Sequence, residues 1–216
     1  SNSLNVAQML EKSSYSISLG NTHQDGIISS TGMDRYNVKV SADTKLTNNW
    51  SSGFTANYIT TSIDKAVTSG NGLLRTVYAA PPSYDLAGIP SHVDGNPYTQ
   101  NSFRGSFDNA YWAMENNKFT EDTNRFFGNV YTSYQTDFGT TNHKLNAKYM
   151  VGVDAYTTHY VDSYGYGSNT GGGRGQIENY GWTNATYNSL LTINYDWHIN
   201  EDWGLNAVLG LSLIHV

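Results

Sequence analysis

Large residues alternate with small or polar ones along most of this chain, with a period of two. In "YSISLG", for example, Tyr15, Ile17 and Leu19 are separated by small residues. A period of two is typical of β-strands, because successive side chains point to opposite faces of a sheet. No segment shows a convincing helical period, so we expect an all-β, antiparallel fold. The predicted strands are residues 2–8, 13–24, 34–46, 50–63, 123–137, 143–159, 181–198 and 203–214.

The lengths of the strands and connections favour a membrane barrel over a soluble sandwich. Many predicted strands are longer than the average of about five or six residues, and a tilted strand needs about 9–11 residues to cross a bilayer. Short connections ("MLEK", "TNN", "FGTTN", "INED") alternate with the longer loops 25–33, 65–122 and 161–180. Short periplasmic turns and long extracellular loops are typical of outer-membrane β-barrels.

Four aromatic residues lie beside the predicted short turns, where an aromatic girdle would meet the membrane surface. A single aromatic residue at a strand end could equally pack over its own hairpin, but four at one edge favour the girdle. They are Trp50, Phe138, Trp197 and Trp203.

One register of the hairpin around turn 139–142 separates a polar face from an apolar face, as a wet lumen and a lipid exterior require. A slip of one residue would mix the two faces. The predicted pairs are Asp137 with Lys144, Gln135 with Asn146, Ser133 with Lys148, Tyr134 with Ala147, Val130 with Val151 and Phe126 with Ala155.

Composition excludes several classes of function. The chain has no cysteine, so disulfides and thiolate metal sites are impossible. A net charge of −6 argues against nucleic-acid binding, because no basic stripe is available to neutralise phosphates. The six histidines lack the spacing of paired metal ligands, and no spacing identifies a catalytic triad. We therefore expect no enzyme activity, metal or cofactor.

Two segments carry a resemblance to a known family. The first is the hairpin "DGII…TG…RYN", from Asp25 to Asn37, and the second is "YWAMENN…TNRFFGN", from Tyr111 to Asn129. With these motifs in this order and spacing, nearly the whole chain resembles the SusC/RagA family of TonB-linked outer-membrane transporters.

The resemblance implies a barrel of about 22 strands with an N-terminal plug, in the outer membrane of a Gram-negative, Bacteroidetes-like bacterium. A TonB complex would energise the import of glycan or peptide fragments beneath a SusD-like surface lipoprotein. Residues 1–216 would then be part of the barrel, without its signal peptide, plug, TonB-contacting region and remaining strands. The end "LSLIHV" either continues a strand or is foreign sequence from library preparation.

The long loop 65–122 is where we expect contact with a solute, because aromatic faces suit sugar rings or peptide side chains. For Tyr111 and Trp112 we favour packing, since the family pattern "YWAMENN" recurs irrespective of substrate. The candidate contact residues are Tyr78, Tyr84, Tyr98, Tyr111 and Trp112.

Two other classes of function remain open. A passive porin or adhesin barrel would have the same strands, and an N-terminal plug in the parent gene would exclude it. A secreted β-sandwich that binds glycans would be soluble, and its apolar faces would meet inside.

Overall fold

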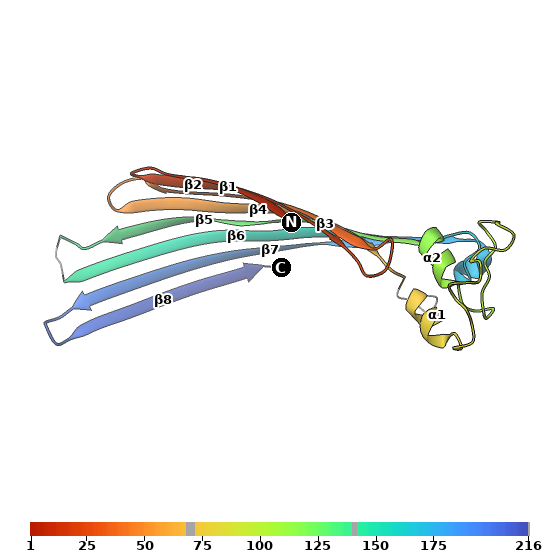
Figure 1. Ribbon diagram of the computed structural model, residues 1–216. Helices are drawn as coiled ribbons and strands as arrows, with labels where there is room; N and C mark the ends of the chain where they lie inside the picture. The colour runs from red at the N-terminus through yellow and green to blue at the C-terminus, as the bar shows by residue number, and fades with distance from the viewer. Residues whose placement is uncertain (68–71, 140–141, 216) are drawn as a thin grey trace.

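The chain folds into one antiparallel sheet of eight strands in chain order (Figure 1). The computed structural model describes residues 1–67, 72–139 and 142–215. The predicted all-β fold class and the succession of hairpins are confirmed, and β1 and β8 lie at the two edges. The strands are β1 (Asn2–Met9), β2 (Ser13–Asp25), β3 (Gly32–Lys45), β4 (Trp50–Lys65), β5 (Lys118–Thr136), β6 (His143–Tyr164), β7 (Gln176–His198) and β8 (Gly204–His215).

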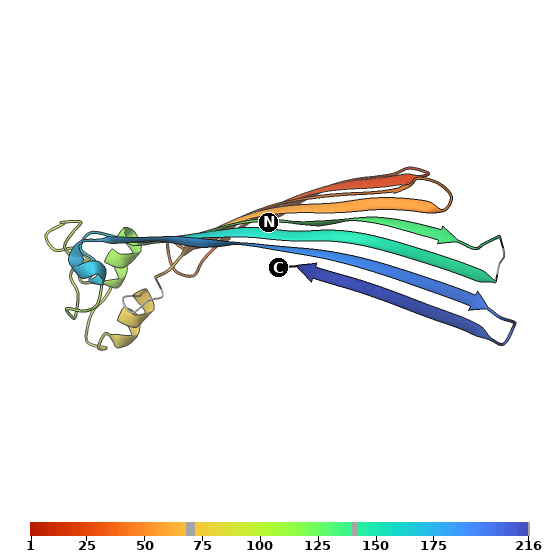
Figure 2. The same cartoon turned by 180° about the vertical axis from the view of Figure 1, so that it is seen from behind.

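The short turns and the long loops lie at opposite ends of the sheet, as their alternation along the chain predicts. Figures 1 and 2 show the helices α1 (Leu73–Ala79) and α2 (Ala110–Asn116) together at the loop end. The expectation that no segment is helical is wrong for these two. Each helix has seven residues, about two turns, which is too short for a 3.6-residue period to show in the sequence.

Three strands run further towards the loop end than the sequence predicts. β5 begins at Lys118 instead of residue 123, β6 continues to Tyr164, and β7 begins at Gln176. Apolar and polar residues alternate only in the part of a strand that has an apolar medium on one side. Backbone hydrogen bonds continue the β-ladder beyond that part. In the extension, Glu121 pairs with Tyr160, and such mixed pairs carry no alternation.

The predicted register of the β5–β6 hairpin is confirmed. Val130 pairs with Val151, and Ser133 pairs with Lys148. The remaining predicted pairs form as well, except for the one made by Asp137, which lies beyond the end of β5. Residues 140 and 141 of the predicted turn lie outside the described residues.

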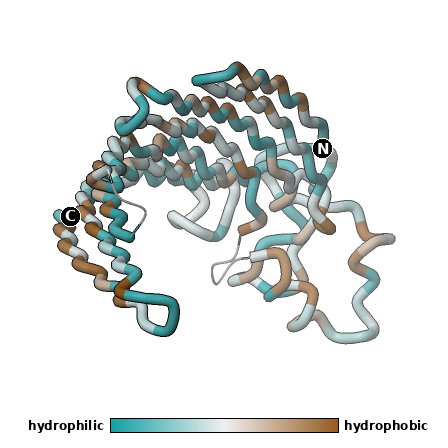
Figure 3. Tube along the Cα trace, turned by 90° about the vertical axis from the view of Figure 1, so that its left-hand side faces the viewer, coloured by the Kyte–Doolittle hydropathy of each residue, from teal (hydrophilic) through white to brown (hydrophobic). Residues whose placement is uncertain are grey.

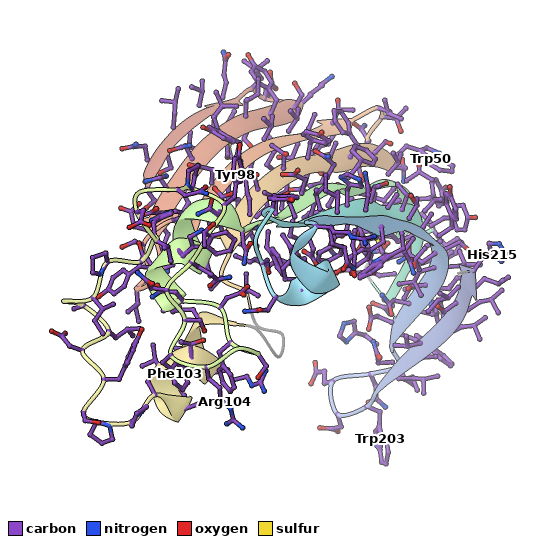
Figure 4. All side chains as sticks on the ribbon, turned by 90° about the vertical axis from the view of Figure 1, so that its right-hand side faces the viewer. Trp50, Tyr98, Phe103, Arg104, Trp203 and His215 are labelled. Carbon is purple, nitrogen blue, oxygen red and sulfur yellow. The ribbon has the colours of Figure 1, made fainter. Side chains whose placement is uncertain are left out.

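The registers place the alternating large residues of all eight strands on one face of the sheet. Figure 3 shows the strands as an arc seen end-on. Trp50 and His215 belong to the apolar face, and in Figure 4 both point away from the hollow of the arc. The apolar face is therefore convex and the polar face concave. One apolar row runs Leu4, Leu19, Val38, Tyr58, Phe126, Ala155 and Ala185, and another runs Tyr15, Ala42, Phe54, Val130, Val151, Ser189 and Leu213.

Buried apolar side chains gather at the loop end, not along the sheet. Val67, Phe119 and Tyr164 form a small cluster there, while Val130 and Val151 on the convex face are 59% and 46% exposed. Within the described residues, no second sheet or layer of helices covers the convex face. No helix there is both long and apolar enough to cross a membrane.

Candidate functional site: the loops and the polar face of the sheet

The long loop 66–117 is folded around a buried carboxylate, that of Asp108, which is 1% exposed. Asp108 accepts hydrogen bonds from the Ser168 hydroxyl at 2.6 Å, from the backbone and side-chain N–H groups of Asn169 at 2.8 Å each, and from Gln100 Nε2 at 2.9 Å. A buried charge is tolerated only when it is well hydrogen-bonded. Because Ser168 and Asn169 follow β6, Asp108 also fastens loop 66–117 to the loop 165–175.

Asn109 and Trp112 continue this core. The Asn109 side chain accepts hydrogen bonds from the backbone N–H groups of Tyr111 and Trp112, so it caps α2. Trp112 is 0% exposed, and its indole Nε1 donates to the carbonyl of Pro97 at 2.9 Å. Trp112 is therefore a core residue of the loop, and no solute reaches it in this conformation.

The other four candidate contact residues do not converge on one site. Tyr78 on α1 is 85% exposed, and Tyr111 on α2 is exposed as well. Tyr84 is half-buried, with its ring 5.6 Å from that of Phe103. Tyr98 packs edge-on against Tyr166 from the loop 165–175, at 5.5 Å. In Figure 4 Tyr98 lies in the upper part of the view, whereas Phe103 and Arg104 lie in its lower part.

The aromatic residues predicted for a girdle all lie at the short-turn end of the sheet. Trp50 begins β4, and its ring lies 4.9 Å from that of Tyr134. Trp197 near the end of β7 stacks on His143 at 5.6 Å. Phe138 and Trp203, in the adjoining turns, are 59% and 70% exposed. Tyr134 also belongs to this row, although it was not among the residues predicted for the girdle.

The concave face is lined by amides and ion pairs. Arg125 Nε donates to Asp154 Oδ1 at 2.8 Å across β5 and β6. Beside them, a hollow opens over Gly152, where a side chain is missing, and Asn129 and Asn188 contribute to its lining. Lys148 holds its ammonium 4.2 Å from the ring centre of Tyr131 on the same face. These groups make the concave face a polar surface that water can hydrate and polar solutes can contact.

An aromatic cluster that the sequence did not predict lies on this face, near the loop end of the sheet. Tyr160 stacks on Tyr180, with ring centres 5.0 Å apart and planes inclined by 9°, and Trp182 lies 5.2 Å from Tyr160. These residues fall in or beside the predicted loop 161–180, which the structure shortens. Tyr180 and Trp182, two positions apart, were the available signal, but the predicted strand began at residue 181 and so left Tyr180 in the loop.

Comparison with known proteins shows a likeness to a solved structure. No protein-family model matches the chain, and no curated protein matches it. It is similar to a chain in the structure of the RagAB peptide importer in the "closed-closed" state, with a TM-score of 0.73 and 15% sequence identity. The alignment covers 98% of this chain and 24% of that one. This likeness is one of fold, and the chain spans about a quarter of the length of the importer chain.

Proposed function

We propose that this chain is part of the wall of an outer-membrane β-barrel that imports a solute, of the SusC/RagA kind. The observation that carries the proposal is the division of one curved sheet into a bare apolar convex face and a polar concave face. Apolar patches of this extent in soluble proteins are covered by other protein. In a barrel, lipid covers the convex face and water fills the lumen.

The height of the apolar band fits a bilayer. On β7 the convex face runs from Trp197 to Tyr187, about 33 Å along the strand at 3.3 Å per residue. With a strand tilt of about 40°, this corresponds to roughly 25 Å across the membrane, the usual height of a barrel's apolar band. Aromatic residues bound the band in β4 as well, with Trp50 at the turn end and Tyr58 at the other. In the proposal, Trp50, Phe138, Trp197 and Trp203 form the periplasmic girdle.

The likeness to a chain of the RagAB peptide importer and the resemblance in the sequence motifs agree on the same kind of protein. The proposal therefore includes the outer membrane as location, a SusD-like surface lipoprotein as partner, and a TonB complex that acts on a plug elsewhere in the parent chain. Residues 1–216 would form about eight strands of a larger barrel, with loop 66–117 outside the cell. The single-layer sheet disfavours the sandwich alternative.

Cysteine labelling of the full-length protein in intact cells tests the orientation. Ser83, exposed in loop 66–117, and Glu201, exposed in the β7–β8 turn, are each replaced by cysteine. A membrane-impermeant maleimide should label Ser83→Cys in intact cells and Glu201→Cys only after the outer membrane is opened. The reverse pattern would contradict the proposed topology.

Uptake measurements separate an importer from a passive pore. Cells that express the full-length gene should accumulate its solute only while a proton gradient is maintained, because a TonB complex draws on that gradient. Uptake that survives collapse of the gradient would favour the porin alternative.

A further inference from the structure

The aromatic cluster of Tyr160, Tyr180 and Trp182 presents open ring surfaces on the concave side of the sheet. Tyr160 lies on the same face of β6 as Asp154, because the two are an even number of residues apart. Tyr180 on β7 is its direct cross-strand partner, and Trp182 lies diagonally opposite. Tyr180 is 44% exposed and Trp182 is 51% exposed. Aromatic residues in the core of a soluble protein are buried, whereas Tyr180 and Trp182 leave part of their ring surface accessible to a ligand.

Polar contacts hold the rings in place before any ligand arrives. Lys65 lies with its ammonium 4.3 Å from the ring centre of Tyr160 and 3.4 Å from Glu121 Oε2. On the other side, the Tyr180 hydroxyl donates to Asp162 Oδ2 at 3.2 Å. Lys65 also demonstrates that a cation fits against a ring of this cluster.

Around Tyr180 the charge is negative. Asp162 and Glu178 flank it, and no ion pair joins either carboxylate to a basic side chain within the described ranges. Glu178 accepts a hydrogen bond from the neutral Gln176 amide at 2.5 Å, and Asp162 Oδ1 is buried with no hydrogen-bond partner. Loss of solvation, followed by the charge of Asp162, raises the pKa of the Tyr180 hydroxyl. Two carboxylates without a cation thus adjoin two open aromatic faces.

We propose that Tyr160, Asp162, Glu178, Tyr180 and Trp182 form a binding surface for a positively charged side chain, the guanidinium or ammonium group of a basic peptide. A cation over an aromatic face is attracted by the ring quadrupole, and carboxylates beside it strengthen the attraction. A neutral sugar ring could stack on Trp182 but would leave both carboxylates without a counter-charge. The inference rests on the proposed function, because it assumes that the concave face lines the path of a solute.

The test is binding of a matched pair of fluorescent tripeptides to the full-length protein in detergent micelles, followed by anisotropy. One peptide has arginine at its centre, and the other has citrulline, which has nearly the same shape but no charge. The arginine peptide should bind about tenfold more tightly. Glu178→Gln and Trp182→Leu should each remove most of this preference. Glu201→Gln, which removes an exposed charge at the opposite end of the sheet, should keep it.

Three results would overturn the inference: equal binding of the two peptides, a preference unchanged in both variants, or binding of maltotriose that depends on Trp182 without any preference for arginine. Failure of the proposed function is distinguishable. A chain that labels as an outer-membrane protein but ignores the charge of the peptide contradicts this inference alone. A chain that prefers arginine but is found in the soluble fraction contradicts the membrane assignment alone.

Discussion

A lysine on the convex face within the apolar band should destabilise the barrel far more than a lysine on the concave face at the same level. Val151 pairs with Val130, which pairs with Phe54, midway along β4 between Trp50 and Tyr58. On β7 the same row contains Ser189, inside the band from Trp197 to Tyr187, so in the proposed orientation the row lies within the hydrocarbon. Val151→Lys would therefore place an ammonium in hydrocarbon, where no protein group is available to pair with it.

The free-energy cost of the Val151→Lys substitution depends on the depth of the lysine in the membrane. Lysine on the lipid face of a barrel costs about 2–4 kcal/mol at the membrane midplane and less towards either surface, so we expect about 2 kcal/mol at Val151. That lowers the folding equilibrium constant roughly 30-fold. The matched control is Asn188→Lys, because Asn188 pairs with Gly152, one residue along from Val151, and lies on the wall of the concave hollow. There the new ammonium stays in water, and we expect a change within about 0.5 kcal/mol.

The assay is urea titration of the full-length protein folded into lipid vesicles, with the heat-dependent shift on gel electrophoresis as the readout of folding. Val151→Lys should move the midpoint to much lower urea, and Asn188→Lys should leave it nearly unchanged. If the convex face met water instead of lipid, Val151→Lys would be nearly neutral. Equal midpoints for the two variants would therefore refute the assignment of the faces.

Three further predictions follow from packing, buried charge and titration. Gly128→Ala should lower the free energy of unfolding by about 1–3 kcal/mol, seen as a lower urea midpoint, because a Cβ there would meet a backbone carbonyl of β4 at 2.3 Å, whereas Gly210→Ala, with open space around it, should not. Asp108→Ala should expose both loops to protease in intact cells while the barrel still assembles, because the buried N–H donors of Asn169 and Gln100 then lose their acceptor; unchanged protease resistance would show that Asp108 does not hold the two loops together. The hydrogen bond that His23 Nδ1 donates to the Asp34 carboxylate, and then the charge of Asp34, raise the pKa of His23 above 6.5, with a smaller effect of Asp25. This contribution to stability is therefore complete below pH 6.5 and is lost as the pH rises through the raised value; NMR titration of His23 should show a smaller shift in Asp34→Asn.

The sequence predicts the sheet well because each strand has one apolar face and one polar face, which imposes a strict alternation on it. Alternation of apolar and polar residues was enough to set the strand order and, at Val130 and Val151, the register to the residue. The pattern ends where the membrane would end. Beyond that level both faces of the strands meet polar surroundings. The residues around Glu178 and Tyr180 therefore show no alternation that would distinguish a strand from a loop.

The folded loop could not be derived from the sequence for a different reason. Its structure depends on one carboxylate, that of Asp108, and on donors from a loop far away in the sequence, such as Ser168. No sequence spacing of Asp and Ser residues predicts this hydrogen bond. The burial of Trp112 likewise depends on the carbonyl of Pro97, a backbone group without any sequence signature. The aromatic residues of the loop were visible in the sequence, but their exposure was not.

The strict chain order of the strands bears on how the sheet assembles. The four short turns each join neighbouring strands within six residues, so those hairpins form from local contacts and close quickly. The β4–β5 junction differs, since the connection between them has roughly fifty residues, which raises the entropic cost of closure by about 2 kcal/mol over a four-residue turn. We therefore expect two four-stranded halves to form first and to join along β4 and β5. Because Asp108 and Trp112 fold the connecting loop, they shorten the effective distance between those halves, so the loop would speed assembly as well as shape the outer surface.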